Sequence, residues 1–298
     1  MNWLYDFTDW LVVTDRAERS IEAYGRDVQA FADWFAERNG QHFAPELLTA
    51  YDVRAYKENL QCRKLSGNTI NRHLSSLRVL AKFAIDAGLI QDHRSPKYVD
   101  VQPPPPRWLE AGELRRLLAE FERAVNAEAV AGRTSRYEQA VRGQAMALLM
   151  AGAGLRVGEV CSLDLDDVTV RERSGTVSVR QGKGDTYAGV PLSVEVRQAL
   201  SAWLAERGDS PGALFTSQKG KRISSRAVQA QFSEMARRAG VEDATPHSLR
   251  HTFIKRVADG HGVHRAQKLG RHADAKQTMR YAQPGRQELL AAVEGLTL

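Results

Sequence analysis

A run of four consecutive prolines, Pro103 to Pro106, places the strongest limit on how this chain can fold. Proline has no backbone N–H and its ring clashes with the preceding helical turn, so no helix can pass through the run. Successive prolines favour a stiff and extended conformation. We therefore predict two domains, residues 1–102 and 108–298, joined by a proline-rich linker at 103–107, each long enough to bury its own core.

The first predicted domain is helical throughout. Its apolar side chains recur at the three- and four-residue spacing of amphipathic helices near residues 3–11, 21–35, 49–60 and 66–86. The last segment is the best defined, because Ser66 and Asn68 can cap its start and Gly88 can end it. Its apolar stripe comprises Ile70, Leu74, Leu77, Leu80, Ala81 and Ala84.

The second predicted domain is helical with a short β-rich interruption. Three segments rich in valine and threonine lie between residues 168 and 192, with a glycine-containing turn at 182–185. Helical spacing is found before and after them, at residues 114–125, 140–150, 194–205, 225–239, 247–258, 265–269 and 275–281. The predicted fold class is mainly α with a small β-sheet.

The charge is distributed unevenly along the chain. Residues 1–50 hold four basic and nine acidic side chains, whereas residues 54–97 hold nine basic and three acidic ones. From residue 107 onward the count is 29 basic against 22 acidic. Such a change from acidic to basic suggests a surface that meets a polyanion, although an ordinary solvated surface is also compatible with it.

Composition excludes several classes of protein. Cys62 and Cys161 are far apart and lack metal-ligand spacing, so we expect neither a disulfide framework nor a metal centre. No run of eighteen apolar residues is present, and the first ten residues lack the basic start of a signal peptide. A cytoplasmic protein without a membrane partner is expected.

Two basic residues of the second domain lie in unusual surroundings. Arg156 lies in the segment GLRVGEV (residues 154–160), at the predicted start of a helix. An arginine is always charged, so it requires either a bound anion or an internal partner such as Glu159. Lys183 lies between two glycines in the predicted turn, where it either reaches a ligand or is simply exposed to solvent.

Two further clusters lie nearer the C-terminus. In PHSLRH (246–251), His247 and Arg250 share a helical face, and an imidazole beside a guanidinium suits an anion and a moving proton. We expect His251 to point elsewhere and to be structural. The segment LGRH (269–272) is followed by Tyr281, which is either a nucleophile or a core residue.

Together these clusters resemble the tyrosine recombinase (phage integrase) family. The family has a Gly-Leu-Arg-x-x-Glu box, a lysine on a β-hairpin turn, a His-x-Leu-Arg-His box, and a Leu-Gly-His box with a tyrosine nine residues beyond its histidine. Matching positions follow in order, at Arg156 with Glu159, Lys183, His247 to His251, and His272 with Tyr281. The first domain resembles the family's four-helix, SAM-like core-binding domain, and the whole chain is similar to the Xer type in size and layout.

The resemblance implies an α/β catalytic domain and a site that needs no metal, cofactor or ATP. Tyr281 is expected to attack a DNA phosphate, giving a 3′-phosphotyrosine and a free 5′ hydroxyl. Arg156 and Arg250 are expected to clamp the non-bridging oxygens, while His247 assists removal of the phenolic proton.

Lys183 and His272 complete the expected catalytic set. Lys183 would protonate the leaving 5′ oxygen, and His272 would donate a hydrogen bond to the phosphate. The chain departs from the family pattern at Arg271, because the family usually has glycine directly before this histidine. The nine-residue interval from His272 to Tyr281 is retained.

The best-defined helix of the first domain also has a basic face. Basic side chains on one face suit a DNA phosphate backbone, and they equally suit a solvated surface. The predicted DNA-binding residues are Arg63, Lys64, Arg72, His73, Arg78 and Lys82.

The predicted function is site-specific recombination, in which double-stranded DNA is cleaved and rejoined with strand exchange between two sites. The family implies a homotetramer on paired sites, a monomer or dimer off DNA, and in some cases a partner recombinase, accessory proteins or a mobile element. The alternatives are an inactive DNA-binding accessory or regulatory protein of the same fold and a tyrosine-type topoisomerase. The apolar tail, with Leu289, Leu290 and Val293, would dock on a neighbouring protomer or pack in cis.

Overall fold

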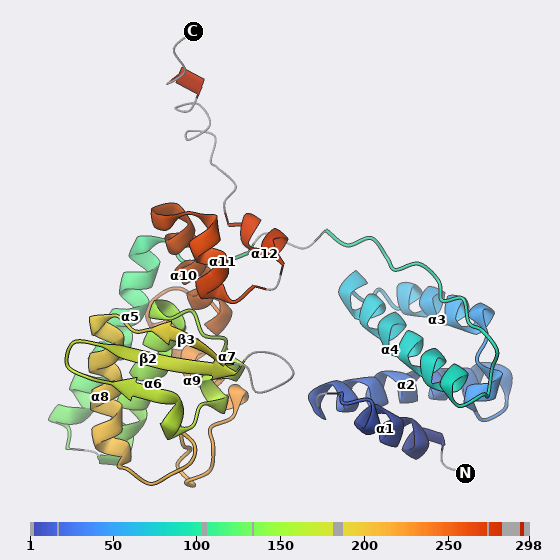
Figure 1. Cartoon of the computed structure of the whole chain (residues 1–298), viewed down its shortest axis with the longest axis horizontal. Helices are drawn as coiled ribbons and strands as arrows, with labels where there is room; N and C mark the ends of the chain where they lie inside the picture. The colour runs from blue at the N-terminus through green and yellow to red at the C-terminus, as the bar shows by residue number, and fades with distance from the viewer. Residues whose placement is uncertain are drawn as a thin grey trace. The chain divides into compact units, whose positions relative to one another are not determined.

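The computed structural model of the chain describes residues 3–16, 18–102, 106–132, 134–180, 187–272, 274–281 and 293–294. The chain divides into two compact units, Met1–Pro104 and Pro105–Leu298 (Figure 1). Each unit buries its own apolar cluster. Most described residues are helical, and a single small sheet lies in the second unit. This confirms the predicted fold class. Within the described residues, no helix combines the length and the apolar character needed to cross a membrane.

The described residues of unit 1 form four helices around an aromatic core. Phe31 lies at the centre, with its ring 5.1 Å from that of Phe43 and 5.2 Å from that of Tyr56 between centroids, both edge to face. Such edge-to-face pairs stabilise a core beyond the burial of their area. The helices are α1 (Trp3–Val13), α2 (Glu18–Asn39), α3 (Ala50–Cys62) and α4 (Gly67–Asp86), with a short 3-10 turn η1 (Pro45–Leu47) before α3.

Helix α4 has the capped and amphipathic character that its sequence predicts. The Ser66 side chain accepts a hydrogen bond from the Thr69 N–H, and Gly88 just beyond the helix has φ +71°. All six predicted stripe residues are buried. His73 is also buried, so its predicted place on an exposed DNA-binding face is wrong. It follows Ile70 by three residues and precedes Leu77 by four, which puts it on the apolar face.

Unit 2 is built around helix α6, which contacts α5, α8, α9 and α10. The sheet packs beside these helices, and α10 to α12 follow one another at the end of the unit (Figure 1). The helices are α5 (Ala111–Val130), α6 (Thr134–Gly152), α7 (Val157–Ser162), α8 (Val194–Arg207), α9 (Ser225–Arg238), α10 (Pro246–His261), α11 (Val263–Gly270) and α12 (Ala275–Met279), with a 3-10 turn η2 (Leu165–Asp167) after α7.

Among the described residues, the sheet contains three antiparallel strands in the order β1 (Val168–Val170), β2 (Gly175–Arg180) and β3 (Tyr187–Pro191). Val177 pairs with Val168 on one side and with Val190 on the other. Val177, Val179 and Val190 are buried, as the two-residue period of a half-buried strand requires. The turn between β2 and β3, which contains Lys183, lies outside the described residues.

Candidate active site

The predicted catalytic residues converge in unit 2 from four segments of the chain. Arg156 caps the start of α7, and His247 and Arg250 lie on α10. His272 follows α11, and Tyr281 follows α12. The helix contacts of α6 with α7 and α10, of α10 with α11, and of α11 with α12 bring these segments together. Lys183 is the remaining predicted member, and its place is outside the described residues.

Arg156 is held by Glu159 but remains accessible. Its Nη1 donates to Glu159 Oε1 (2.7 Å), and its backbone N–H donates to Oε2 of the same carboxylate (2.7 Å). The internal partner considered from the sequence is therefore present. The Arg156 side chain is nevertheless 41% exposed, so its guanidinium can also meet a ligand from solvent.

Arg250 is buried, and backbone carbonyls fix its orientation. Its two terminal nitrogens donate to the carbonyl oxygens of Gly154 and Gly270, one at the turn before α7 and one at the end of α11. Burial and the positive charge of Arg156 lower its pKa to about 10, which still leaves it charged at neutral pH. A buried charge with neutral acceptors favours an anionic partner.

The departure at Arg271 adds a third guanidinium to the same cluster. Arg271 Nη2 donates to Glu159 Oε2 at 2.6 Å, and Arg250 Nη1 lies 3.9 Å from that oxygen. Three arginines thus surround one carboxylate. The cluster has an excess of positive charge, which is the electrostatic character of an anion site.

Tyr281 is buried between two imidazoles. A hydrogen bond joins its hydroxyl to His251 Nδ1, and its ring stacks on that of His272, with 6.2 Å between centroids. The ring also packs in an apolar cluster with Ile254 and Ala266. Burial raises the Tyr281 pKa, although nearby arginines oppose the shift, so the free phenol is protonated at neutral pH.

The expectation that His251 points away from this site is wrong. His251 follows His247 by four residues, and that spacing places two side chains on one helical face as effectively as three does. The two rings lie 6.3 Å apart between centroids. The spacing alone could have identified His251 as a member of the cluster, and the structure makes it the partner of the Tyr281 hydroxyl.

The imidazoles of His247, His251 and His272 all favour the neutral form. Burial and neighbouring positive charge lower the pKa of His247, and they lower the pKa of His251 and of His272 to about 4. A neutral imidazole can accept a proton, as a general base must. His272 is fixed by a 2.8 Å hydrogen bond between its Nδ1 and the hydroxyl of Thr278, which is fully buried.

The basic residues predicted to bind DNA in unit 1 have varied surroundings. Arg63 and Lys64 are exposed at the end of α3. Arg72 forms an ion pair with buried Asp27 (3.1 Å), and Lys82 forms one with Asp86 (3.0 Å).

Arg78 has two partners within unit 1. Its guanidinium carbon lies 3.7 Å from the ring centroid of Tyr98, and its Nη2 donates to the Pro96 carbonyl (2.8 Å). It is therefore already engaged inside the unit.

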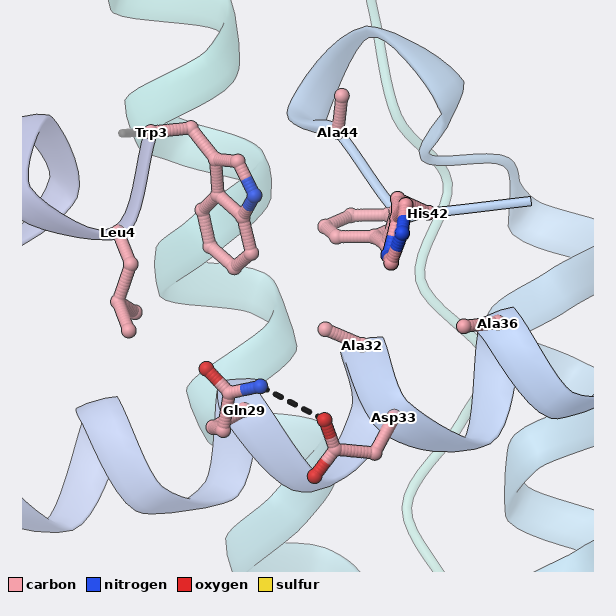
Figure 2. A pocket seen from close by; sticks show the side chains of 9 residues that line it. Trp3, Leu4, Gln29, Ala32, Asp33, Ala36, His42 and Ala44 are labelled. Atoms are coloured by element: carbon pink, nitrogen blue, oxygen red, sulfur yellow. Dashed lines mark hydrogen bonds between the residues drawn. The ribbon is translucent and has the colours of Figure 1, made fainter. Parts of the chain in front are cut away.

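Unit 1 also has a surface hollow of about 730 Å³, lined by α1, α2 and residues 42–44. Figure 2 shows Trp3 and His42 on opposite sides of it, with Gln29 donating to Asp33 below (2.7 Å). Its lining is mostly apolar or small. One carboxylate and one imidazole do not form a set for phosphoryl transfer, so the candidate chemistry lies in unit 2.

The known families and proteins that match this chain confirm the resemblance to tyrosine recombinases that the sequence motifs predicted. Residues 107–288 match the phage integrase family, and residues 4–88 match the N-terminal SAM-like domain of phage integrases. The tyrosine recombinase XerC of Alcanivorax borkumensis is 30% identical over 84% of this chain and 80% of that protein. The XerC of a Methylobacterium species is 31% identical over 96% of this chain and 90% of that protein.

Solved structures show the same fold. The XerH site-specific recombinase bound to its difH substrate superposes with a TM-score of 0.70, at 21% identity over 92% of this chain and 79% of that one. A lambda integrase dimer bound to a COC′ core site gives a TM-score of 0.68, at 18% identity over 95% of both chains. On the strength of the family match and the XerC relatives, the chain belongs to the phage integrase family of tyrosine recombinases.

Proposed function

We propose that this chain recombines double-stranded DNA at specific sites through a 3′-phosphotyrosine formed by Tyr281. One observation carries the proposal. The Tyr281 hydroxyl is hydrogen-bonded to the neutral imidazole of His251. In the same unit, three guanidiniums surround the single carboxylate of Glu159. A phenol with a proton acceptor, near an excess of positive charge, suits attack on a phosphodiester.

In the first step the Tyr281 oxygen forms a bond to phosphorus as the phenolic proton passes to His251. The phenol is a weak nucleophile while protonated, and its raised pKa increases the need for a base. His251 Nδ1 is already in contact with the hydroxyl, so this proton transfer needs no rearrangement. This assigns to His251 the role that the sequence suggested for His247.

Arg156 and Arg250 would bind the non-bridging oxygens of the scissile phosphate. Two planar guanidiniums stabilise the charge that gathers on these oxygens in the transition state. His272, whose ring stacks on that of Tyr281, and His247, whose ring lies beside that of His251, would donate hydrogen bonds to the same phosphate.

The bond between phosphorus and the 5′ oxygen breaks in the same displacement. Lys183 would give its proton to the departing oxygen, which becomes a 5′ hydroxyl. Because the phosphotyrosine keeps the energy of the phosphodiester, the 5′ hydroxyl of a second duplex can attack it without ATP. Strand exchange between two sites follows from this reversibility.

Assembly on DNA extends the proposal beyond one active site. Exposed Arg63 and Lys64 would contact phosphates, and four protomers would assemble on two sites in the cytoplasm. The C-terminal tail, of which the structure describes only Val293 and Glu294, would dock on a neighbouring protomer. Deleting residues 286–298 should then abolish pairing of two sites while one site is still bound; unchanged pairing would contradict tail docking.

The recombinase proposal is tested with a duplex selected from random sequence for tight binding. A nicked form of this duplex, incubated with the protein in EDTA, should give a covalent adduct that resists denaturant. Adding a second duplex with a free 5′ hydroxyl should transfer the labelled strand to it without ATP. A duplex of the same composition in shuffled order should give neither product.

Two outcomes would favour the alternatives. Tight binding without any adduct would indicate an accessory protein that kept the fold. Relaxation of supercoiled DNA that is indifferent to the selected sequence would indicate a topoisomerase.

A further inference from the structure

Arg271 has a left-handed backbone conformation, which glycine adopts far more readily than residues with a side chain do. It caps the end of α11 with φ 52° and ψ 46°, in the left-handed region. A Cβ atom in this region crowds the following carbonyl, and glycine avoids that strain. Glycine, which the family usually has at this position, would therefore satisfy the backbone better.

The Arg271 guanidinium is enclosed, with its side chain 3% exposed. Its Nη2 donates to Glu159 Oε2 (2.6 Å) and to the Gly154 carbonyl (3.2 Å), and its Nη1 donates to the Leu269 carbonyl (3.1 Å). Leu269 lies on its own helix, whereas Gly154 and Glu159 flank the start of α7. Arg271 thus ties the end of α11 to the segment that presents Arg156.

Both partners of Arg271 on that segment also hold a guanidinium proposed to bind phosphate. Glu159 accepts from Arg156 through both of its oxygens, and the Gly154 carbonyl accepts from Arg250. Burial alone would raise the Glu159 pKa, but Arg271 and then Arg156 outweigh it and hold that pKa below its ordinary value. Glu159 therefore stays ionised, which lets it orient Arg156.

We infer that Arg271 is a positioning residue for phosphoryl transfer, one that sets Arg156 through Glu159 and Arg250 through the Gly154 carbonyl. The inference rests on the proposed function. Arg271 is too enclosed to contact DNA itself, so it acts on the rate only through its contacts with Glu159 and with the Gly154 carbonyl. Errors in the placement of transition-state donors by about 1 Å can reduce a rate by about a hundredfold.

The test compares Arg271→Gly with wild type by single-turnover cleavage of the nicked duplex at saturating protein. The expected result is a rate constant lower by about tenfold to a hundredfold with unchanged DNA affinity. A purely structural role would lower the fraction of active protein, and hence the amplitude, without changing the rate constant. Arg271→Lys keeps the charge and should react at a rate between those of Arg271→Gly and wild type.

A matched control separates backbone strain from the side chain. Asp15, in unit 1, has φ 54°, so Asp15→Gly makes the same backbone change away from this cluster and should leave the rate constant unchanged. A double-mutant cycle then tests the route through Glu159. Arg271→Gly should slow cleavage less in a Glu159→Gln background than in wild type.

The outcomes distinguish this inference from the proposed function. If wild type forms no adduct, the proposed function fails. If wild type cleaves and Arg271→Gly cleaves with the same rate constant, only the inference is overturned. An equal loss in the wild-type and Glu159→Gln backgrounds would also overturn it, because Arg271 would then act independently of Glu159.

Discussion

At the scale of single residues, the surroundings of Tyr281 assign separate tasks to similar side chains. His251 bonds to the phenol, whereas His272 stacks on its ring and bonds to Thr278. The guanidiniums of Arg156 and Arg250 are held by Glu159 and by backbone carbonyls. Each group is fixed before substrate arrives, which reduces the reorganisation needed in the transition state.

Replacing His251 should slow the covalent step. His251→Phe keeps a flat ring but removes the nitrogen that we propose accepts the phenolic proton, so adduct formation should slow by about a hundredfold or more. Single-turnover cleavage measures the rate, and DNA affinity should be unchanged. His261→Phe, at the exposed end of the same helix, is the control. Cleavage by His251→Phe at the wild-type rate would remove His251 from the mechanism.

The buried imidazoles should make the stability of the protein depend on pH. His251 and His272 have a pKa of about 4 when folded and about 6.5 when unfolded, so the unfolded chain binds more protons between these values. Their contribution to the free energy of unfolding is complete above pH 6.5 and is lost as the pH falls toward 4. Denaturant titrations across this window should show a decline, smaller in His251→Phe. An identical decline in both proteins would contradict the assignment.

The sequence identified most of these residues because their spacing follows the family motifs. It missed His251, which shares a helical face with His247, since a motif box does not show which side chain reaches the tyrosine. It also placed His73 on a DNA-binding face, although helical spacing puts His73 beside buried Ile70 and Leu77. Both errors concern the direction of one side chain on a correctly predicted helix.

At the scale of elements, the turn between α6 and α7 positions the arginine cluster. Gly154 has φ +65°, and its carbonyl accepts from both Arg250 and Arg271. A Cβ atom at this position would clash with the ring of Phe253. The turn therefore requires glycine twice, for its backbone conformation and for its close approach to α10.

Gly154→Ala and Gly240→Ala should separate these two requirements. Gly240 has φ +67° and open space around it, so its replacement should lower the free energy of unfolding by only the left-handed backbone strain, about 1–2 kcal/mol. Gly154→Ala should lower it by about 1–3 kcal/mol more through overpacking, and should also slow cleavage. Denaturant titration and adduct assays measure both. Equal effects of the two changes would contradict the role given to this turn.

Helices and strands were predictable because each carries its own signal. Val177 and Val190 alternate with less buried neighbours in paired strands, and α4 is capped by Ser66 and ends before Gly88. The contacts between elements carry no such signal. That Arg271 at the end of α11 reaches Glu159 on α7, 112 residues away, depends on packing that no local pattern encodes.

At the scale of the whole molecule, two units with separate cores follow one another along the chain. The proline run at 103–106 marks the boundary in the sequence, and the structure divides between Pro104 and Pro105. Unit 2 alone contains the described candidate chemistry, while unit 1 presents exposed Arg63 and Lys64. A division between a catalytic unit and a helical unit with exposed basic side chains suits an enzyme that must both bind DNA and cleave it.

The proposed nucleophile is tested by identifying the residue that becomes covalently attached to DNA. The adduct formed on a nicked duplex is digested with nuclease and protease, and mass spectrometry locates the remaining nucleotide. It should lie on Tyr281 through a 3′ phosphate, and Tyr281→Phe should bind the duplex with wild-type affinity yet form no adduct. A nucleotide on any other residue, or an adduct formed by Tyr281→Phe, would contradict the account.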